Sequence, residues 1–181
     1  MIAYKNHATT ITLIGMPGSG KSTVGVILAK LSGLRFVDTD LDIQVREHAT
    51  LQAILERHGY QYLRAIEQEV LLAIDLDDAV IATGGSVVYS EVAMRRLKSA
   101  GLIVYLETGL ANLQQRVALA PLRGIASDPG QSYAQVFAER TPLYQRYADI
   151  TITTDDLCAE QVAAQALLRL DFSNQSTGKV K

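Results

Sequence analysis

The feature of the sequence that most constrains its fold is the stretch GMPGSGKST at residues 15–23. It fits the P-loop pattern, a glycine followed after four residues by Gly-Lys-Ser or Gly-Lys-Thr, and it follows an apolar, strand-like run that ends at Ile14. Glycine lets the backbone turn its N–H groups around an anion, and a helix beginning near Lys21 adds unpaired N-terminal donors. The pattern predicts a strand, a phosphate-binding loop and a helix. The alternative interpretation is a glycine-rich turn that only caps a helix.

The residues of such a loop have separate tasks. Lys21 is expected to contact the β- and γ-phosphates of a nucleoside triphosphate, and Ser22 to offer its hydroxyl to Mg²⁺. The residues expected to bind the nucleotide are Gly18, Ser19, Gly20, Lys21, Ser22 and Thr23. A nucleoside triphosphate site is therefore the first functional prediction.

Size and composition exclude several classes of protein. A chain of 181 residues with 48% hydrophobic content suits one α/β domain, which we expect to span residues 1–181. The net charge of -2 argues against broad binding to nucleic acid, which needs a large basic surface. No apolar run approaches the roughly 18 residues of a membrane span. We expect neither nucleic acid nor a membrane as a partner.

The cysteine and histidine content indicates a reducing compartment and shows no metal-binding motif. Cys158 is the only cysteine, so no internal disulfide can form, and the first ten residues lack the apolar core of a secretory signal. The three histidines do not have the spacing of a metal-ligand set. We therefore expect a cytoplasmic protein.

Short β-like runs alternate with longer helical stretches along the chain. The expected strands are residues 10–14, 35–37, 79–82, 102–106 and 149–153. This alternation predicts a parallel sheet covered on both faces, with ligands at the carboxyl ends of its strands. In residues 61–74, apolar side chains recur at helical spacing, which predicts one buried stripe. Residues from about 172 to 181 are polar and are expected to form a frayed tail.

Two breaks in regular structure are candidates for function. The turn TGGS at 83–86 follows an apolar strand and places flexible backbone where α/β proteins bind ligands. The second break, about residues 119–131, contains prolines and glycines and is long enough to form a mobile lid. It carries Arg123, and Arg116 lies one or two turns earlier.

Several stretches together resemble the shikimate kinases, over roughly residues 10–155. They are GMPGSGKST, FVDTD at 36–40, LRAIE at 63–67, TGGS, PLRG at 121–124 and ERTPLY at 139–144. The resemblance implies a three-layer P-loop kinase fold, with a central five-stranded parallel sheet, helices on both faces and a mobile lid. It also implies transfer of the γ-phosphate of ATP to the 3-hydroxyl of shikimate, a step toward chorismate and the aromatic amino acids.

The resemblance assigns roles around the transferred phosphate. Asp40 would orient the acceptor hydroxyl or act as its base, and Asp38 would belong to the outer shell of Mg²⁺. Arg123 would reach the transferring phosphoryl group, so that Lys21, Asp40 and Arg123 form the catalytic set. For the two aspartates the alternative is helix N-capping.

The resemblance also assigns residues to the two substrates. Arg64 and Arg140 would bind the shikimate carboxylate, for which a guanidinium fork is well shaped, with Gly84 and Gly85 bringing the backbone close. Arg116 would stack against adenine. The alternatives are an exposed ion pair of Arg64 with Glu67, a pair of Arg140 with Glu139, and solvated charges on the lid and the preceding helix.

The chain departs from the usual family pattern at four positions near the expected acceptor pocket. Ser86 replaces a third glycine, Gly124 a proline, Leu63 a phenylalanine and Tyr60 a glutamate. The pocket could therefore fit shikimate with altered affinity or accept another small polyhydroxy acid. The rival kinase functions are those for gluconate or for a nucleoside monophosphate. An ATP-binding relative without kinase activity is a further alternative. The main expectation is that the protein binds ATP and shikimate and that it is a monomer.

Overall fold

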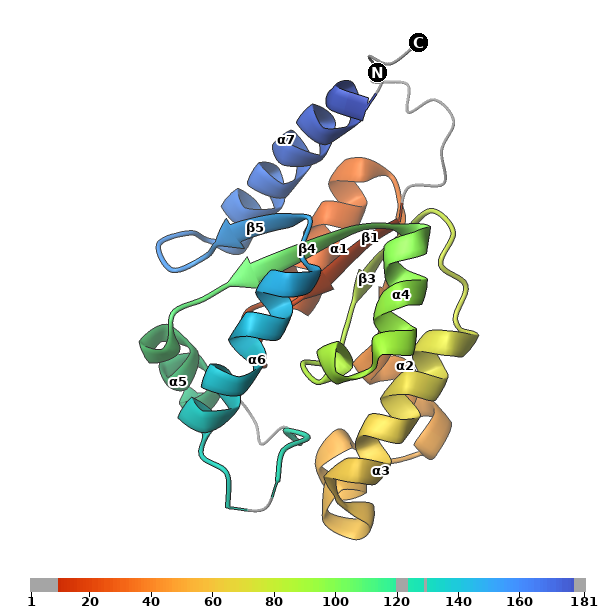
Figure 1. Ribbon diagram of the computed structural model, residues 1–181, viewed down its shortest axis with the longest axis vertical. Helices are drawn as coiled ribbons and strands as arrows, with labels where there is room; N and C mark the ends of the chain where they lie inside the picture. Colours follow the sequence, from red (N-terminus) through yellow and green to blue (C-terminus); the bar gives the residue numbers. More distant parts are fainter. Residues whose placement is uncertain (1–9, 120–123, 129, 178–181) are drawn as a thin grey trace.

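The computed structural model describes residues 10–119, 124–128 and 130–177, with side chains as far as Leu170. It contains a five-stranded sheet with the order β2-β3-β1-β4-β5, in which every neighbouring pair is parallel (Figure 1). The strands are β1 (Thr10–Ile14), β2 (Arg35–Asp38), β3 (Ala79–Ala82), β4 (Gly101–Glu107) and β5 (Ile150–Thr153). All five predicted strands are confirmed, with ends that differ by one residue at most.

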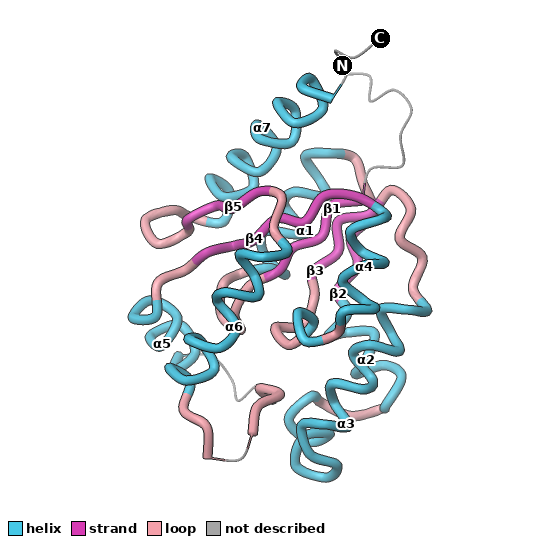
Figure 2. The backbone as a smooth tube through the Cα atoms, in the orientation of Figure 1, coloured by secondary structure: helices cyan, strands magenta, loops and turns pink. Residues whose placement is uncertain are grey.

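Helices connect the strands and cover both faces of the sheet (Figure 2). They are α1 (Lys21–Ser32), α2 (Thr39–Glu47), α3 (Leu51–Ala73), the 3₁₀ helix η1 (Val87–Tyr89), α4 (Glu91–Ala100), α5 (Leu110–Leu119), α6 (Tyr133–Tyr147) and α7 (Ala159–Thr177). The predicted α/β class with helices on both faces is confirmed. The segment expected to be a frayed tail is helical as far as Thr177.

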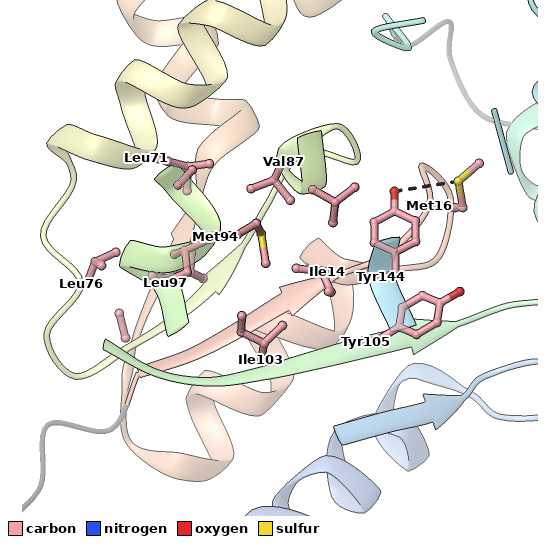
Figure 3. Packing of buried hydrophobic residues seen from close by; sticks show 14 of the residues in the cluster. Ile14, Met16, Leu71, Leu76, Val87, Met94, Leu97, Ile103, Tyr105 and Tyr144 are labelled. Carbon is pink, nitrogen blue, oxygen red and sulfur yellow. Dashed lines mark hydrogen bonds between the residues drawn. The ribbon is translucent and has the colours of Figure 1, made fainter. Parts of the chain in front are cut away.

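Alternate side chains of the strands pack into two apolar layers. Leu13 and its neighbours in β3 and β4 pack with α1 and α7. On the other face, Ile14, Ile103 and Tyr105 pack with Met94 and Leu97 of α4 (Figure 3). Since successive residues of a strand point to opposite faces, both layers form from continuous apolar runs.

A third apolar cluster lies where α2 and α3 pack together. Leu63, Ile66 and Val70 of α3 are buried there, as the helical stripe predicted, and Ala126 joins them. Within α3, Gly59 has a φ of 80° and a ψ of 171°, a left-handed break that favours glycine. This cluster supports one wall of the candidate site.

Within the described ranges, no helix is long and apolar enough to cross a membrane.

Candidate active site

The loop between β1 and α1 has the geometry of a phosphate-binding loop. Gly15 has a φ of 147°, and a Cβ there would lie 2.8 Å from the Leu106 carbonyl oxygen. The N-cap of α1, Gly20, is in the left-handed region, which starts the helix at Lys21. Lys21 Nζ donates to the carbonyl oxygens of Gly15 and Met16 at 2.8 and 2.9 Å. The lysine is thereby held inside the loop.

A pocket of about 410 Å³ opens beside this loop, at the carboxyl ends of β1 and β3. Its lining residues are Pro17, Gly18, Gly20, Lys21, Ser22, Thr23, Asp40, Leu51, Glu67, Thr83, Gly85, Ser86, Arg116, Val117, Gly124, Ile125, Ala126 and Arg140. The position agrees with the rule that open α/β sheets bind ligands at the carboxyl ends of their strands.

Most of the predicted site residues meet in this pocket. Four that the structure describes do not line it: Ser19, Asp38, Arg64 and Gly84. Ser19 is buried in the loop, and its backbone N–H bonds to the Met16 carbonyl oxygen at 3.1 Å. Arg123 lies outside the described residues.

The two aspartates after β2 have different surroundings. Asp38 is the N-cap of α2, and its Oδ1 accepts a hydrogen bond from the Asp40 N–H at 3.0 Å. For Asp38, this contact is the helix N-capping that sequence analysis left as the alternative to a metal role. Its side chain lines a separate, more open groove along β2. Asp40 lines the pocket, where its Oδ1 would lie 3.1 Å from a Cβ at Gly84. Only Asp40 therefore faces the space for an acceptor.

Glu67 is a buried carboxyl group between Asp40 and the turn at residues 83–86. Its pKa is raised to about 8, first by burial and then by the charge of Asp40, while Arg140, Arg64 and Lys21 act in the opposite direction. Ser86 donates its hydroxyl hydrogen bond to Glu67 Oε2. The Glu67 carboxyl therefore carries a proton at neutral pH beside an acidic neighbour.

The glycine turn is shaped by what lies behind it. A Cβ at Gly84 would collide with Glu67 Oε1, and one at Gly85 would lie 2.8 Å from Pro17 Cδ. Tyr144 Oη donates to the Gly85 carbonyl oxygen at 2.5 Å and lies 3.9 Å from Met16 Sδ, the contact drawn in Figure 3. Tyr144 thus connects the glycine turn to the P-loop.

Arg64 and Arg140 come from different helices and converge on one acceptor atom. Arg64 Nη2 donates to the Ala126 carbonyl oxygen at 3.1 Å, and Arg140 Nη2 donates to the same oxygen at 2.5 Å. Arg140 is 1% exposed, and an arginine is rarely buried so deeply unless it has hydrogen-bond partners. Two guanidinium groups aimed at one oxygen form a site for an anionic oxygen.

Neither arginine makes the ion pair that sequence alone left as an alternative. Among the residues with described side chains, no ion pair joins Arg64 to Glu67 or Arg140 to Glu139. Instead, the Tyr89 ring lies 4.0 Å from Arg64 Cζ and 5.3 Å from Arg140 Cζ, measured to the ring centroid.

Residues 124–126 form part of the pocket wall. A Cβ at Gly124 would lie 2.6 Å from the Leu51 carbonyl oxygen at the start of α3. Glycine at this position therefore permits a close approach of two backbones that a side chain would prevent. This accounts for one of the four departures from the usual family pattern.

Arg116 occupies the far end of the pocket, beside the loop after β5. Its Nη2 lies 3.5 Å from the Thr154 carbonyl oxygen. Next to it, the Asp155 carboxylate accepts hydrogen bonds from Gly109 N and Asn112 Nδ2, both at 2.8 Å, and these bonds lower the pKa of Asp155. Asn112, Arg116 and Asp155 therefore lie close together where α5 meets the loop after β5.

Sequence analysis did not assign Glu67 or Tyr89 to the site. The three-residue spacing of Arg64 and Glu67 indicates only that they share a side of one helix. Tyr89 carries no motif, since its role depends on contacts with α3 and α6.

Comparison with known proteins decides the family. The family model described as shikimate kinase matches residues 17–171. The chain belongs to the shikimate kinase family. It is 35% identical over 169 residues to the shikimate kinase of Coxiella burnetii strain RSA 493, covering 91% of this chain and 94% of that protein. It is 36% identical over 165 residues to shikimate kinase 1 of Yersinia enterocolitica, covering 89% and 95%.

A solved structure of the same family is similar over nearly the whole chain. The shikimate kinase of Acinetobacter baumannii in complex with shikimate has a TM-score of 0.78 and 31% identity, covering 96% of each chain. The resemblance to the shikimate kinases is thus confirmed, and so is the P-loop kinase fold.

Proposed function

We propose that this protein transfers the γ-phosphoryl group of ATP to the 3-hydroxyl of shikimate. The observation that carries the proposal is the convergence of Arg64 and Arg140 on one oxygen position, with Arg140, Asp40 and the P-loop lining one pocket. An acceptor with both a carboxylate and a hydroxyl can contact the arginines and Asp40 at once. The base of a nucleoside monophosphate has neither a carboxylate for the two arginines nor a hydroxyl for Asp40.

The chain's own residues account for the positioning that phosphoryl transfer requires. The acceptor oxygen forms a bond to the γ-phosphorus, the bond to the β,γ-bridging oxygen breaks, and ADP leaves. The hydroxyl proton passes toward Asp40, which faces the pocket. The proton held on Glu67 relieves charge repulsion at Asp40, and Lys21 offsets negative charge on the phosphates. Arg123 is proposed to reach the transferred group.

The residues present fit a magnesium ion that takes most of its ligands from the phosphates of the nucleotide and from water. No group of three or more His, Cys, Asp or Glu able to hold a metal occurs among the side chains described. Mg²⁺ in kinases takes one or two protein oxygens and substrate phosphates, and the Ser22 hydroxyl lines the pocket as one such donor. Asp38 would contribute through water. When bound, the ion neutralises charge on the phosphates.

The remaining assignments follow from the same proposal. The pocket lining includes Gly18, Gly20, Thr23 and Arg116. The first three are proposed to bind the nucleotide, and Arg116 to stack against adenine. Gly84 and Gly85 would allow the shikimate ring to approach. We propose a cytoplasmic monomer, because the lone, exposed Cys158 suits a compartment where thiols stay reduced.

The test is ADP release from Mg-ATP with shikimate, with gluconate, with nucleoside monophosphates and without acceptor. We expect stimulation by shikimate alone. Arg64→Ala should raise the KM for shikimate at least about tenfold, the order of one charge-assisted hydrogen bond, and Asp40→Ala should lower kcat about a hundredfold.

The matched control is Arg57→Ala, which removes an exposed arginine from the same helix and should change neither constant. Stimulation by gluconate or a nucleotide in place of shikimate would contradict the proposed acceptor. Binding of ATP with no acceptor-dependent ADP release would contradict kinase activity itself.

A further inference from the structure

Tyr89 contacts both arginines of the candidate acceptor site. Its ring centroid lies 4.0 Å from Arg64 Cζ and 5.3 Å from Arg140 Cζ. Its hydroxyl accepts a hydrogen bond from Arg140 Nε at 3.4 Å and donates one to Glu139 Oε1 at 2.7 Å. One side chain thus connects a residue of α3 to a residue of α6.

The backbone that carries Tyr89 is fixed to the glycine turn. The Tyr89 N–H bonds to the Ser86 carbonyl oxygen at 3.0 Å, and the Ser90 N–H bonds to that of Val87 at 2.9 Å. Ser90 then caps α4 by accepting from the Ala93 N–H at 3.2 Å. The ring therefore projects from a rigid turn, which can set the position of longer and more flexible side chains.

Arg64 depends on aromatic contacts more than Arg140 does. Arg140 is 1% exposed, whereas Arg64 is half-buried. Among residues with described side chains, Arg64 Nε has no hydrogen-bond partner, and the only hydrogen bond found for its guanidinium goes to Ala126. The Tyr60 ring lies 5.0 Å from Arg64 Cζ, and Tyr89 lies closer. A guanidinium stacks well on such faces.

We propose that Tyr89 is a positioning residue that holds Arg64 and Arg140 in the relative orientation in which they share one carboxylate. The inference rests on the proposed function, because it concerns the carboxylate of the acceptor. Tyr89 acts through the arginines and not on the reacting atoms. Its loss should therefore weaken acceptor binding and leave the nucleotide site unchanged.

Steady-state kinetics of Tyr89→Leu, Tyr89→Phe and the matched control Tyr62→Leu test the proposal. Tyr62 is an exposed tyrosine on α3, and its ring is tilted against that of His58 with centroids 4.6 Å apart. We expect Tyr89→Leu to raise the KM for shikimate about tenfold, with the KM for ATP within about twofold and kcat within about threefold of wild type. Tyr89→Phe keeps the ring and should raise the shikimate KM about threefold, while Tyr62→Leu should change nothing.

A double-mutant cycle separates positioning from a general structural role. If Tyr89 acts through Arg64, Tyr89→Leu should raise the shikimate KM in the Arg64→Ala background by less than a third of its effect in wild type. Where Tyr89→Leu does not fold, the Tyr89→Phe effect should likewise shrink in the Arg140→Lys background, because the hydroxyl contacts Arg140.

The two proposals fail in different ways. A wild-type enzyme without shikimate-dependent ADP release overturns the proposed function and this inference with it. With shikimate turnover present, an unchanged shikimate KM in folded Tyr89→Leu overturns the inference alone. Fully additive effects with Arg64→Ala, or an equal rise in the KM for ATP, would do the same.

Discussion

At the scale of single residues, Glu67 is a group whose ionisation depends strongly on the fold. An exposed glutamate titrates near 4.5, but burial and the charge of Asp40 raise the pKa of Glu67 to about 8. Three cations around it oppose that shift without cancelling it. The carboxyl is therefore protonated in the folded protein over a pH range in which the unfolded chain has already lost the proton.

This difference predicts a loss of stability as the pH rises. Between about pH 5 and pH 8 the folded state holds one proton more than the unfolded state at Glu67, so the free energy of unfolding falls with increasing pH. Gln mimics the protonated form, so Glu67→Gln should remove this dependence. Relative to the variant, the wild type should lose roughly 2 to 3 kcal/mol between about pH 5.5 and pH 8.

Urea unfolding at these two pH values measures the effect. The control is Glu56→Gln, an exposed glutamate on α3, whose difference from wild type should stay constant with pH. An equally constant difference for Glu67→Gln would show that Glu67 is ionised in the folded protein.

At the scale of elements, the start of α2 combines a structural and a proposed functional role in one side chain. Asp38 Oδ1 accepts the Asp40 N–H, so it satisfies a donor that the helix leaves unpaired and fixes the backbone that carries Asp40. The same carboxylate is the proposed outer-shell group for Mg²⁺. Since capping needs only a side-chain oxygen and the ion prefers a charge, two substitutions can separate the roles.

Asp38→Ala should destabilise the protein by about 1 kcal/mol, the usual cost of losing an N-cap, whereas Asp38→Asn should keep most of the stability. Both variants should need a several-fold higher Mg²⁺ concentration for half-maximal turnover. Urea unfolding and Mg²⁺ titration of ADP release measure the two effects. An unchanged Mg²⁺ requirement in Asp38→Asn would contradict the proposed role of Asp38 at the metal ion and leave helix capping as its role.

At the scale of the whole molecule, Tyr144 connects parts that lie far apart in the sequence. Its hydroxyl bonds to the Gly85 carbonyl oxygen, and its ring stacks on Tyr105 of β4 with centroids 5.2 Å apart. Burial raises the pKa of Tyr144 far above its ordinary value, so it stays a neutral donor. The nucleotide loop, the glycine turn and the sheet therefore share one buried side chain.

Tyr144→Phe should keep the ring packing and leave the Gly85 carbonyl oxygen without this donor. A buried acceptor left unpaired costs about 1 to 3 kcal/mol, and about 1 kcal/mol lowers the Tm of a chain of this size by about 2 to 4 °C. Thermal unfolding should thus show a Tm roughly 2 to 12 °C lower. Tyr147→Phe, at the partly buried end of the same helix, should shift the Tm much less.

The sequence predicted the fold well because a parallel sheet leaves a strong local signal. β1 and β3 are buried along their whole length and the middle of β4 is buried, so these strands appear as short, largely apolar runs, and the glycines of residues 15–20 mark the turn into α1. Asp40, Arg116 and Arg140 line the pocket as predicted, because they lie in motifs that follow strands or belong to long helices.

The contacts that the sequence did not predict depend on tertiary structure. The backbone oxygen of Ala126 carries no residue-type signal, and the buried state of Glu67 depends on the packing of α3 against the glycine turn. Tyr89 is one of 8 tyrosines with no spacing that distinguishes it. Only the arrangement of α3, η1 and α6 places it between two arginines.

The shared oxygen of Ala126 has a consequence for selectivity. A ligand that takes the Nη2 donors of Arg64 and Arg140 exchanges with this carbonyl, so the chain supplies an internal competitor for these donors. The competitor is neutral, and hydrogen bonds from arginine are stronger to an anion than to a neutral oxygen. A carboxylate therefore gains free energy in the exchange, whereas an uncharged polyol exchanges one neutral oxygen for another. The Ala126 carbonyl oxygen is therefore expected to favour acceptors with a carboxylate over uncharged ones.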